Sequence, residues 1–463
     1  MNPKKRYKKI GFISAILGLA VFCFFLIFSA KKSPCNVLLI TVDALRADHL
    51  SYYGYKRLTS PNIDRLAEEG TIFLNSFSVS GSTIYTMPAL FTGAYLGLSI
   101  NEVQQTVHSY ENVLDKKFTT LAEYLQSLGY ETAAFLSHGH LGVGTGFEQG
   151  FNIYKNFLGK DNVITDKVID FLNNYRSNKP FFLWIHYIGV HSPYVFPEGY
   201  INDFEEDRLY EENDKILKLN LENGNNSYES HGYLPRIVFR KGHYSLNYYI
   251  ACYDAAIRHV DFQIGRVLER IKSNTLIIVT ADHGESLGEH NVYFHHEGLS
   301  DAILHIPLII KDDRYFKRRG RIPVVASSID IVPTILKIVN PVVYFLNKHK
   351  FNGVDLTGIL KNRGIKRIYL YFYYSQIHGV RDVHKNIKYF LHKNGKEELY
   401  FIPDEDDNLI DDVSGEIPSL LKTLRNNLKA WLNSYPIQSD KNIVGVPLDK
   451  KTEENLRSLG YLN

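Results

Sequence analysis

The sequence feature that most constrains the fold is a short, wholly apolar run that stops at a carboxylate and an imidazole. Residues 275–280 read TLIIVT, and Asp282, His283 and Gly284 follow. A β-branched run that is this short and this apolar is typical of a strand buried on both faces of a parallel sheet. Ligands of open α/β sheets bind beyond the carboxyl ends of the strands. The run therefore predicts one wall of a metal or anion site, and a polar loop that merely caps the strand is the alternative.

The same pattern recurs elsewhere in the chain. The apolar run at 36–42 ends at Asp43, the run at 181–188 is followed by His191, and further strands are predicted at 131–136 and 306–310. We therefore expect an α/β fold built on a doubly wound, mostly parallel sheet. Its carboxyl edge would gather Asp43, His191, Asp282 and His283. Two carboxylates and imidazoles together make a hard-to-borderline site for a divalent metal.

Hydroxyl side chains are dense just before a predicted helix start in residues 80–93. A helix N-terminus has free N–H groups and positive potential, which suits a bound anion or an ionised hydroxyl. The alternative is ordinary helix capping by Ser82 or Thr83.

Helices are predicted at 60–70, from Thr120 to about Gly129, and from about 248 to 271. Beyond 315 the pattern changes to shorter strands at 368–373, 387–391 and 398–402, with a late helix at about 419–432. We expect a catalytic domain over 36–315 and a smaller α+β subdomain over 316–463.

The N-terminus predicts a membrane anchor. Residues 10–30 are almost wholly apolar, which is long enough to span a bilayer as a helix. The basic run at residues 4–9 precedes it, so residues 1–9 are predicted to be a cytoplasmic tail and the remainder to lie outside, in the periplasm or the extracellular space. We expect a single-pass protein of the cell membrane; a cleaved signal peptide is the alternative.

Composition excludes some classes of function. The formal net charge of +3 is too close to neutral to indicate a nucleic-acid partner. The three cysteines make neither a disulfide framework nor a cysteine-based zinc site.

Taken together, the motifs resemble the sulfatase family of the alkaline phosphatase-like superfamily. The segments that carry the resemblance are VDALRADHL at 42–50, SPNIDRLAEEG at 60–70, residues 182–194, DHGESLGEH at 282–290, SIDIVPTIL at 328–336 and LRSLGYL at 456–462. The resemblance covers residues 36–463 and implies the same α/β fold.

The resemblance also implies roles for individual residues. Asp43, Asp282 and His283 would be ligands of one divalent metal ion. His191 and His295 would contact the oxyanion or the leaving group of the ester, with His296 as the alternative to His295. Arg46 would support the metal site, and His138 and His140 lie near positions where members often have a lysine and a histidine.

The nucleophile position departs from the family pattern. Sulfatases have Cys or Ser in Cys/Ser-x-Pro-x-Arg, and that residue is oxidised to formylglycine. Counting back from Thr92 and Gly93 places Thr83 there, with Tyr85 and Met87 at the proline and arginine positions. Threonine cannot give the same aldehyde, whereas superfamily relatives that act on phosphate esters and phosphonates often use an unmodified threonine. Thr83 would then be both nucleophile and metal ligand, and zinc or manganese becomes as plausible as calcium.

The sequence thus predicts a membrane-anchored hydrolase of sulfate, phosphate or phosphonate esters, whose substrate is an envelope glycan or lipid. Two alternatives stay open. One is a transferase that moves phosphoethanolamine or phosphoglycerol onto envelope polymers, and the other is an inactive sulfatase-like domain that binds a glycan or an anion.

Overall fold

The structure is a computed structural model that describes residues 35–96, 114–205, 214–219, 230–316, 319–359, 367–375, 377–401 and 418–434. The predicted tail at 1–9, the predicted anchor at 10–30 and the family-like segment at 456–462 lie outside these ranges. Across the described part of the chain, no helix combines the length and the apolar character that crossing a membrane requires.

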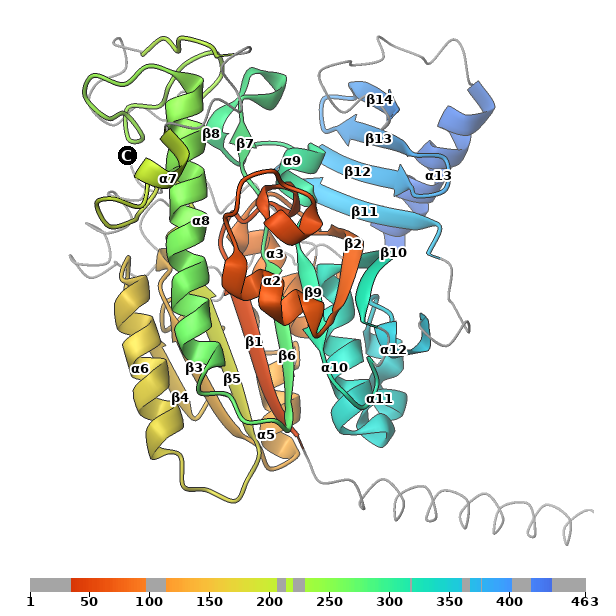
Figure 1. Ribbon diagram of the computed structural model, residues 1–463. Coiled ribbons are helices and arrows are strands. Elements are labelled where there is room, and N and C mark those ends of the chain that lie inside the picture. Colours follow the sequence, from red (N-terminus) through yellow and green to blue (C-terminus); the bar gives the residue numbers. More distant parts are fainter. Residues whose placement is uncertain are drawn as a thin grey trace, which may run out of the picture.

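An eight-stranded sheet forms the centre of the molecule (Figure 1). Its strands are β1 (Asn36–Val42), β2 (Thr71–Phe77), β3 (Glu131–Leu136), β4 (Ile153–Asn156), β5 (Phe181–Tyr187), β6 (Thr275–Ala281), β9 (Leu308–Lys311) and β10 (Gly320–Ser327). Their order is β10-β2-β9-β6-β1-β5-β3-β4, and β9 is the one strand that runs antiparallel to its neighbours. The predicted mostly parallel sheet is confirmed.

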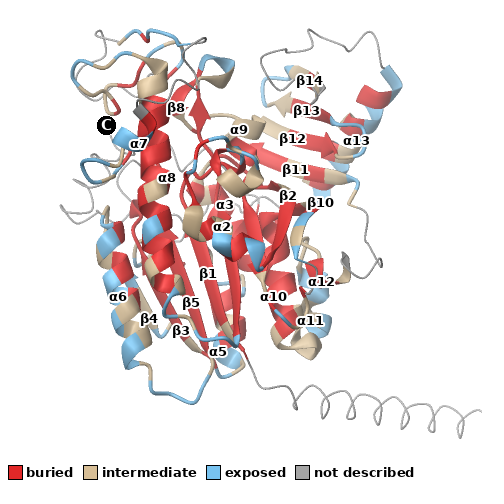
Figure 2. Ribbon diagram, in the orientation of Figure 1, coloured by how far each residue is buried: buried red, intermediate tan, exposed pale blue. Residues whose placement is uncertain are grey.

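Helices cover both faces of this sheet, as a doubly wound fold requires. One core joins strand residues such as Leu38 and Ile40 to α2 (Pro61–Glu68), α6 (Asp161–Asn174) and α8 (Leu246–Leu268). The other core joins Val37 and Leu39 to α3 (Thr83–Thr92), α5 (Leu121–Ser127) and α10 (Ile331–Val339). Because alternate residues of β1 enter opposite cores, the strand is buried on both faces from Val37 to Val42 (Figure 2).

Three of these helices agree with the sequence patterns. α2 has proline in its first turn, and α5 begins with the expected capping box between Thr120 and Glu123. α8 is anchored to the start of α2, because the Asp261 carboxylate accepts hydrogen bonds from the backbone N–H groups of Asn62 and Ile63.

The second sheet is small and antiparallel, in the order β11-β12-β13-β14. Its strands are β11 (Tyr369–Tyr374), β12 (Ile377–Asp382), β13 (Ile387–His392) and β14 (Glu397–Phe401), and α13 (Pro418–Ser434) packs against them. The expected boundary at 315/316 does not coincide with the division between the sheets, because β10 and α10 belong to the large one. The remaining elements are α7 (Asn202–Glu205), β7 (Ser286–Leu287), β8 (Tyr293–His295), α9 (Asp301–Leu304), α11 (Pro341–Asn347) and α12 (Leu356–Ile359).

Candidate active site

The carboxyl ends of four neighbouring strands bring the predicted site together. β1 lies between β6 and β5, and β3 follows β5. Val42 pairs with both Ala281 and Tyr187, so Asp43 lies level with Asp282. The sheet register thus places Asp43, His138, Asp282 and His283 at one edge, and all four side chains are buried.

Asp43 lies at the centre of this cluster. Both of its carboxylate oxygens are buried, and among the described residues neither has a hydrogen-bond partner of good geometry. Imidazole nitrogens face them instead: His283 Nε2 is 3.5 Å from Oδ1, and His138 Nε2 is 3.0 Å from Oδ2. Burial, reinforced by the charge of Asp282, raises the pKa of Asp43 well above its usual range. A cation beside Asp43 would offset this cost and satisfy the orphaned oxygens.

Thr83 is the first residue of α3, and its hydroxyl faces the acidic cluster. Oγ1 donates a hydrogen bond to Asp282 Oδ2 at 2.8 Å and lies 3.3 Å from His283 Nε2. Ser82 is the N-cap residue of α3, and its side chain makes no capping hydrogen bond. The capping alternative therefore does not account for the Thr83 hydroxyl.

Hydrogen bonds to the backbone set the tautomer of each imidazole. His283 Nδ1 donates to the Gly284 carbonyl at 2.9 Å, which leaves Nε2 unprotonated and able to bind a metal. His138 has the opposite arrangement, because its Nδ1 accepts the backbone N–H of His140 at 3.1 Å. A neutral His138 therefore carries its proton on Nε2, toward Asp43.

These tautomers distinguish two groups whose donor atoms lie within 4.8 Å of one another. The groups are Asp43–Asp282–His283 and Asp43–His138–His186. The first offers an unprotonated imidazole nitrogen, two carboxylates and the adjacent Thr83 hydroxyl. This donor set of mixed oxygen and nitrogen fits a divalent cation. The predicted ligand set Asp43, Thr83, Asp282 and His283 is thus brought together, while the second group holds a protonated nitrogen.

Sequence reasoning missed His186. It lies in β5, opposite Thr41 of β1, and its Nδ1 is 2.8 Å from the Thr41 hydroxyl. Its Nε2 is buried 3.9 Å from Asp43 Oδ2 and has no hydrogen-bond partner within the described part of the chain. A lone imidazole in an otherwise apolar strand is the signal that could have identified it.

His191 and His296 lie on the outer side of this cluster. His296 stacks on His283 with ring centroids 4.6 Å apart, and the ring of His191 is 5.2 Å from that of His296. His191 Nδ1 donates to the Ser192 carbonyl and His296 Nδ1 donates to the Gly81 carbonyl. Both Nε2 atoms are therefore unprotonated. Burial lowers the pKa of His191 to about 3 and that of His296 well below its usual range, so both rings are neutral at pH 7.

The structure separates His295 from His296, which the sequence had left as alternatives. His295 stacks on the far side of His296 at 4.9 Å, and its side chain is 23% exposed. Its Nδ1 lies 3.8 Å from Glu297. His296, and not His295, is the ring that contacts His283 directly.

Arg46 supports the loops of the site. Its guanidinium pairs with Asp48 and Glu289, each at 2.7 Å, and donates to the Glu285 carbonyl at 3.1 Å. These contacts fix the segment after Asp282 and His283. His140 is buried beside His138, with ring centroids 5.2 Å apart, and burial lowers its pKa to about 3.

Glycine is required at two positions where the backbones meet. A Cβ on Gly284 would lie 2.2 Å from the Ala302 carbonyl oxygen. A Cβ on Gly81 would lie 2.7 Å from the His296 carbonyl oxygen. Close packing at these glycines holds the Thr83, His283 and His296 segments against one another.

Comparisons with known proteins give the family of this chain. The Sulfatase family model matches residues 35–341. The chain is 28% identical over 356 residues to the uncharacterized sulfatase YidJ of Escherichia coli, covering 66% of this chain and 68% of YidJ. It is 23% identical to an N-acetylglucosamine-6-O-sulfatase of Bacteroides thetaiotaomicron, covering 92% and 91% of the two chains.

The fold also matches solved structures of this kind. The phosphonate monoester hydrolase of Agrobacterium radiobacter superposes with a TM-score of 0.64 at 18% identity, over 86% of this chain and 96% of the hydrolase. Sulfatases use a divalent metal, and the buried Asp–His cluster is a possible site for it. The family model spans more than half of the sequence, and the chain therefore belongs to the sulfatase family of ester hydrolases.

Proposed function

We propose that this protein is a membrane-anchored, metal-dependent hydrolase of phosphate or phosphonate esters in which Thr83 is the nucleophile. One observation carries the proposal. The Thr83 hydroxyl lies at the start of α3, within 2.8 Å of Asp282 Oδ2 and 3.3 Å of His283 Nε2. A hydroxyl held against a carboxylate and an imidazole is poised for activation.

A threonine at the nucleophile position favours attack on a phosphorus ester over the formylglycine reaction of sulfatases. The formylglycine of sulfatases forms by oxidation of a Cβ that carries two hydrogens and the sulfur or oxygen of Cys or Ser. The Cβ of Thr83 carries a methyl group in place of one of these hydrogens, so its oxidation cannot give an aldehyde. Thr83 must therefore act as an alkoxide, which attacks a phosphorus centre directly.

Asp43, Thr83, Asp282 and His283 would hold the divalent cation. Once bound, the cation would act as a Lewis acid that lowers the pKa of the Thr83 hydroxyl and offsets negative charge on the ester oxygens. Calcium, zinc and manganese all suit these donors, and the imidazole favours zinc or manganese.

The reaction then proceeds in two displacements at phosphorus, first by Thr83 and then by water. The Thr83 hydroxyl proton passes to Asp282, its hydrogen-bond acceptor. Oγ1 forms a bond to phosphorus while the bond from phosphorus to the leaving oxygen breaks, and that oxygen takes a proton. Water next attacks phosphorus and gives a proton to the imidazole that protonated the leaving oxygen. The bond to Oγ1 breaks, and Thr83 regains its proton from Asp282.

His191 and His296 are the proposed proton donors to the leaving oxygen. Both rings are neutral without substrate, because burial lowers the pKa of each. The negative charge of a bound ester favours the protonated imidazole and raises the pKa of the nearby ring. Their Nδ1 atoms are held by backbone carbonyls, so the Nε2 atoms are the ones that exchange this proton.

Turnover on a panel of esters tests this function. The full-length protein would be loaded with zinc, manganese or calcium and offered an aryl sulfate, an aryl phosphate and an aryl phosphonate ester. Cleavage of a phosphorus ester over the sulfate is expected. Preferential sulfate cleavage would contradict the proposal, and transfer of the group to an added alcohol in preference to water would replace hydrolase by transferase.

Alanine variants of the two adjacent histidines should differ. His296→Ala is expected to lower kcat/KM by about 100-fold or more, because it removes a ring at the reacting centre. His295→Ala should change it by about 3-fold or less, since His295 lies on the outer side of His296 and loses no contact with His283. Steady-state kinetics on both variants shows which histidine is catalytic. A larger loss of kcat/KM in His295→Ala than in His296→Ala would assign the catalytic role to His295.

The membrane anchor belongs to the same proposal. Residues 10–30 have the length and apolar character of a spanning helix, and the basic run before them favours a cytoplasmic N-terminus. The catalytic domain would then face the periplasm or the exterior, where ester groups of envelope glycans or lipids are available.

A further inference from the structure

An apolar and basic surface lies on and just after α11. Phe345 is 62% exposed and Leu346 is 55% exposed, and none of the residues of α11 is buried. Lys348, His349 and Lys350 follow and are exposed, and Lys348 Nζ lies 4.7 Å from the centroid of the Phe345 ring. We call residues 345–350 the base patch. Adjacent exposed aromatic and aliphatic side chains flanked by lysines are typical of a segment that lies in a membrane interface.

The base patch lies at the edge of the large sheet where the parallel strands begin. β10 runs parallel to β2, and both run in the direction of β1 and β6. α10 follows the carboxyl end of β10 and packs back along the sheet, so α11 lies at the opposite edge from the candidate active site (Figure 1).

Contacts connect this patch to the point where the chain enters β1. Tyr124 of α5 donates a hydrogen bond to Asn347 Oδ1 at 3.4 Å, and its ring lies 6.0 Å from that of Phe351. Tyr130 follows the C-terminal end of α5, and its hydroxyl donates a hydrogen bond to the Cys35 carbonyl at 3.0 Å. The base patch and Cys35 therefore belong to one end of the molecule.

The predicted anchor would hold this end of the molecule close to the bilayer. Only residues 31–34 separate it from Cys35, so Cys35 is at most about 18 Å along the chain from the last anchor residue. The headgroup region on each side of the hydrocarbon core is about 5–7 Å thick. A span this short keeps the strand-start edge close to the headgroups.

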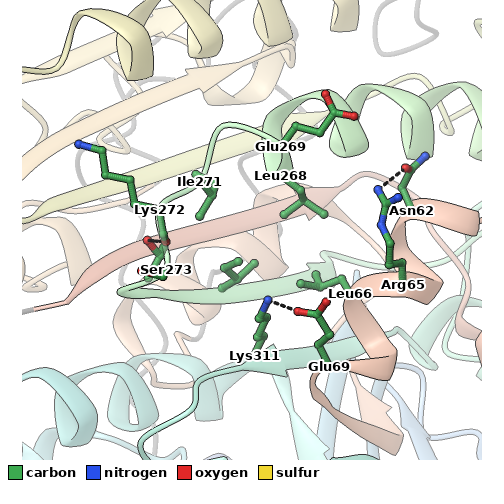
Figure 3. Close-up of a pocket in the computed structure, with 12 residues that line it drawn as sticks. Asn62, Arg65, Leu66, Glu69, Leu268, Glu269, Ile271, Lys272, Ser273 and Lys311 are labelled. Atoms are coloured by element: carbon green, nitrogen blue, oxygen red, sulfur yellow. Dashed lines mark hydrogen bonds and ion pairs between the residues drawn. The ribbon is translucent and has the colours of Figure 1, made fainter.

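Basic side chains extend along the same edge. A cavity of about 320 Å³ lies near the start of β6, and its charged lining residues are the basic Arg65, Lys272 and Lys311 and the acidic Glu69 and Glu269 (Figure 3). Lys311 pairs with Glu69, while Lys272 extends away from the other lining side chains (Figure 3). Lys272 and the lysines of the base patch suit anionic lipid headgroups.

We propose that the base patch docks on the membrane surface, with Phe345 and Leu346 at the headgroup boundary and the lysines on anionic headgroups. This inference rests on the anchor within the proposed function and does not depend on Thr83. It orients the large sheet with its strand starts toward the bilayer. The candidate active site then faces away from the bilayer. It lies about 23 Å or more from the edge where the strands begin, which is the length of a seven-residue strand. That orientation favours esters carried by envelope glycans over the headgroups of the lipids in the anchoring membrane.

Fluorescence quenching by brominated lipid tests the docking. The full-length protein would be reconstituted in bilayer discs of phosphatidylcholine and phosphatidylglycerol, with plain or brominated acyl chains. Phe345→Trp places a reporter in the base patch. Val143→Trp is the matched control, because Val143 is 77% exposed and follows the carboxyl end of β3, at the catalytic edge. The native Trp184 and Trp431 are buried and give a common background.

Brominated lipid is expected to reduce the added emission of Phe345→Trp at least about twofold and to leave that of Val143→Trp unchanged. Equal Phe345→Trp emission in plain and brominated discs would overturn the docking. Stronger quenching of Val143→Trp, or failure of the protein to co-purify with the discs, would overturn it as well. Ester turnover by both variants, measured in parallel, reports separately on the fold and on the proposed catalysis.

Discussion

Replacement of Thr83 by alanine is expected to lower kcat by about 10⁴-fold or more, because the nucleophile and one donor to the cation are lost together. The fold should persist. The change removes one hydroxyl and one methyl group, and α3 keeps Ser82 as its N-cap residue. Metal-loaded wild type and variant would be compared on the best phosphorus ester, with the Tm of each recorded.

Two further variants separate nucleophilic attack from packing. Thr83→Ser retains the hydroxyl and should keep measurable turnover. Thr92→Ala removes a buried hydroxyl at the other end of α3 that, among the described residues, donates to the Pro88 carbonyl of its own helix, and it should leave kcat within about 3-fold. Substantial turnover by Thr83→Ala would exclude Thr83 as the nucleophile, whatever the behaviour of the other two.

Substitution of Asp43 by asparagine should abolish metal-dependent stabilisation without destabilising the metal-free protein. Wild type should gain about 3 kcal/mol when the cation is present at about 100 times its Kd, which appears as a rise in Tm. Asp43→Asn should lose that rise, because the central carboxylate ligand is gone. The metal-free variant should melt at or above the wild-type temperature, since it no longer buries a carboxylate beside the carboxylate of Asp282.

Thermal unfolding with and without zinc or manganese, after chelation, measures both effects. Asp170→Asn is the control, because the side chain of Asp170 is 63% exposed on α6 and lies outside the cluster. A metal-dependent rise that survives in Asp43→Asn would show that the cation binds elsewhere.

The strand-end carboxylates were predictable because a simple physical rule governs them. A continuous apolar run marks a strand buried on both faces, and neighbouring parallel strands end at a common edge. Asp43 and Asp282 therefore had to meet once β1 and β6 became neighbours, as their register shows. The Thr83 position came from counting within a family motif, and its contact with Asp282 agrees with that count.

Other features depend on contacts that no local pattern specifies. His186 was missed because the strand signal of β5 concealed the one polar side chain that points from it into the cluster. His295 and His296 are adjacent in sequence, and only the stacking of His296 on His283 distinguishes them. The antiparallel direction of β9 and the inclusion of β10 in the large sheet arise from pairing between distant segments. The apolar pattern of a strand does not indicate which other strand it pairs with.

The most direct test of the account is to identify the residue that becomes covalently modified during turnover. Metal-loaded enzyme would be mixed with an aryl phosphate, quenched in acid during the first turnover, digested and analysed by mass spectrometry. The account predicts one phosphoryl group on the peptide that contains Thr83, and none in Thr83→Ala. A phosphoryl group on another residue, or a stoichiometric burst of the aryl alcohol from enzyme that stays unmodified, would contradict it.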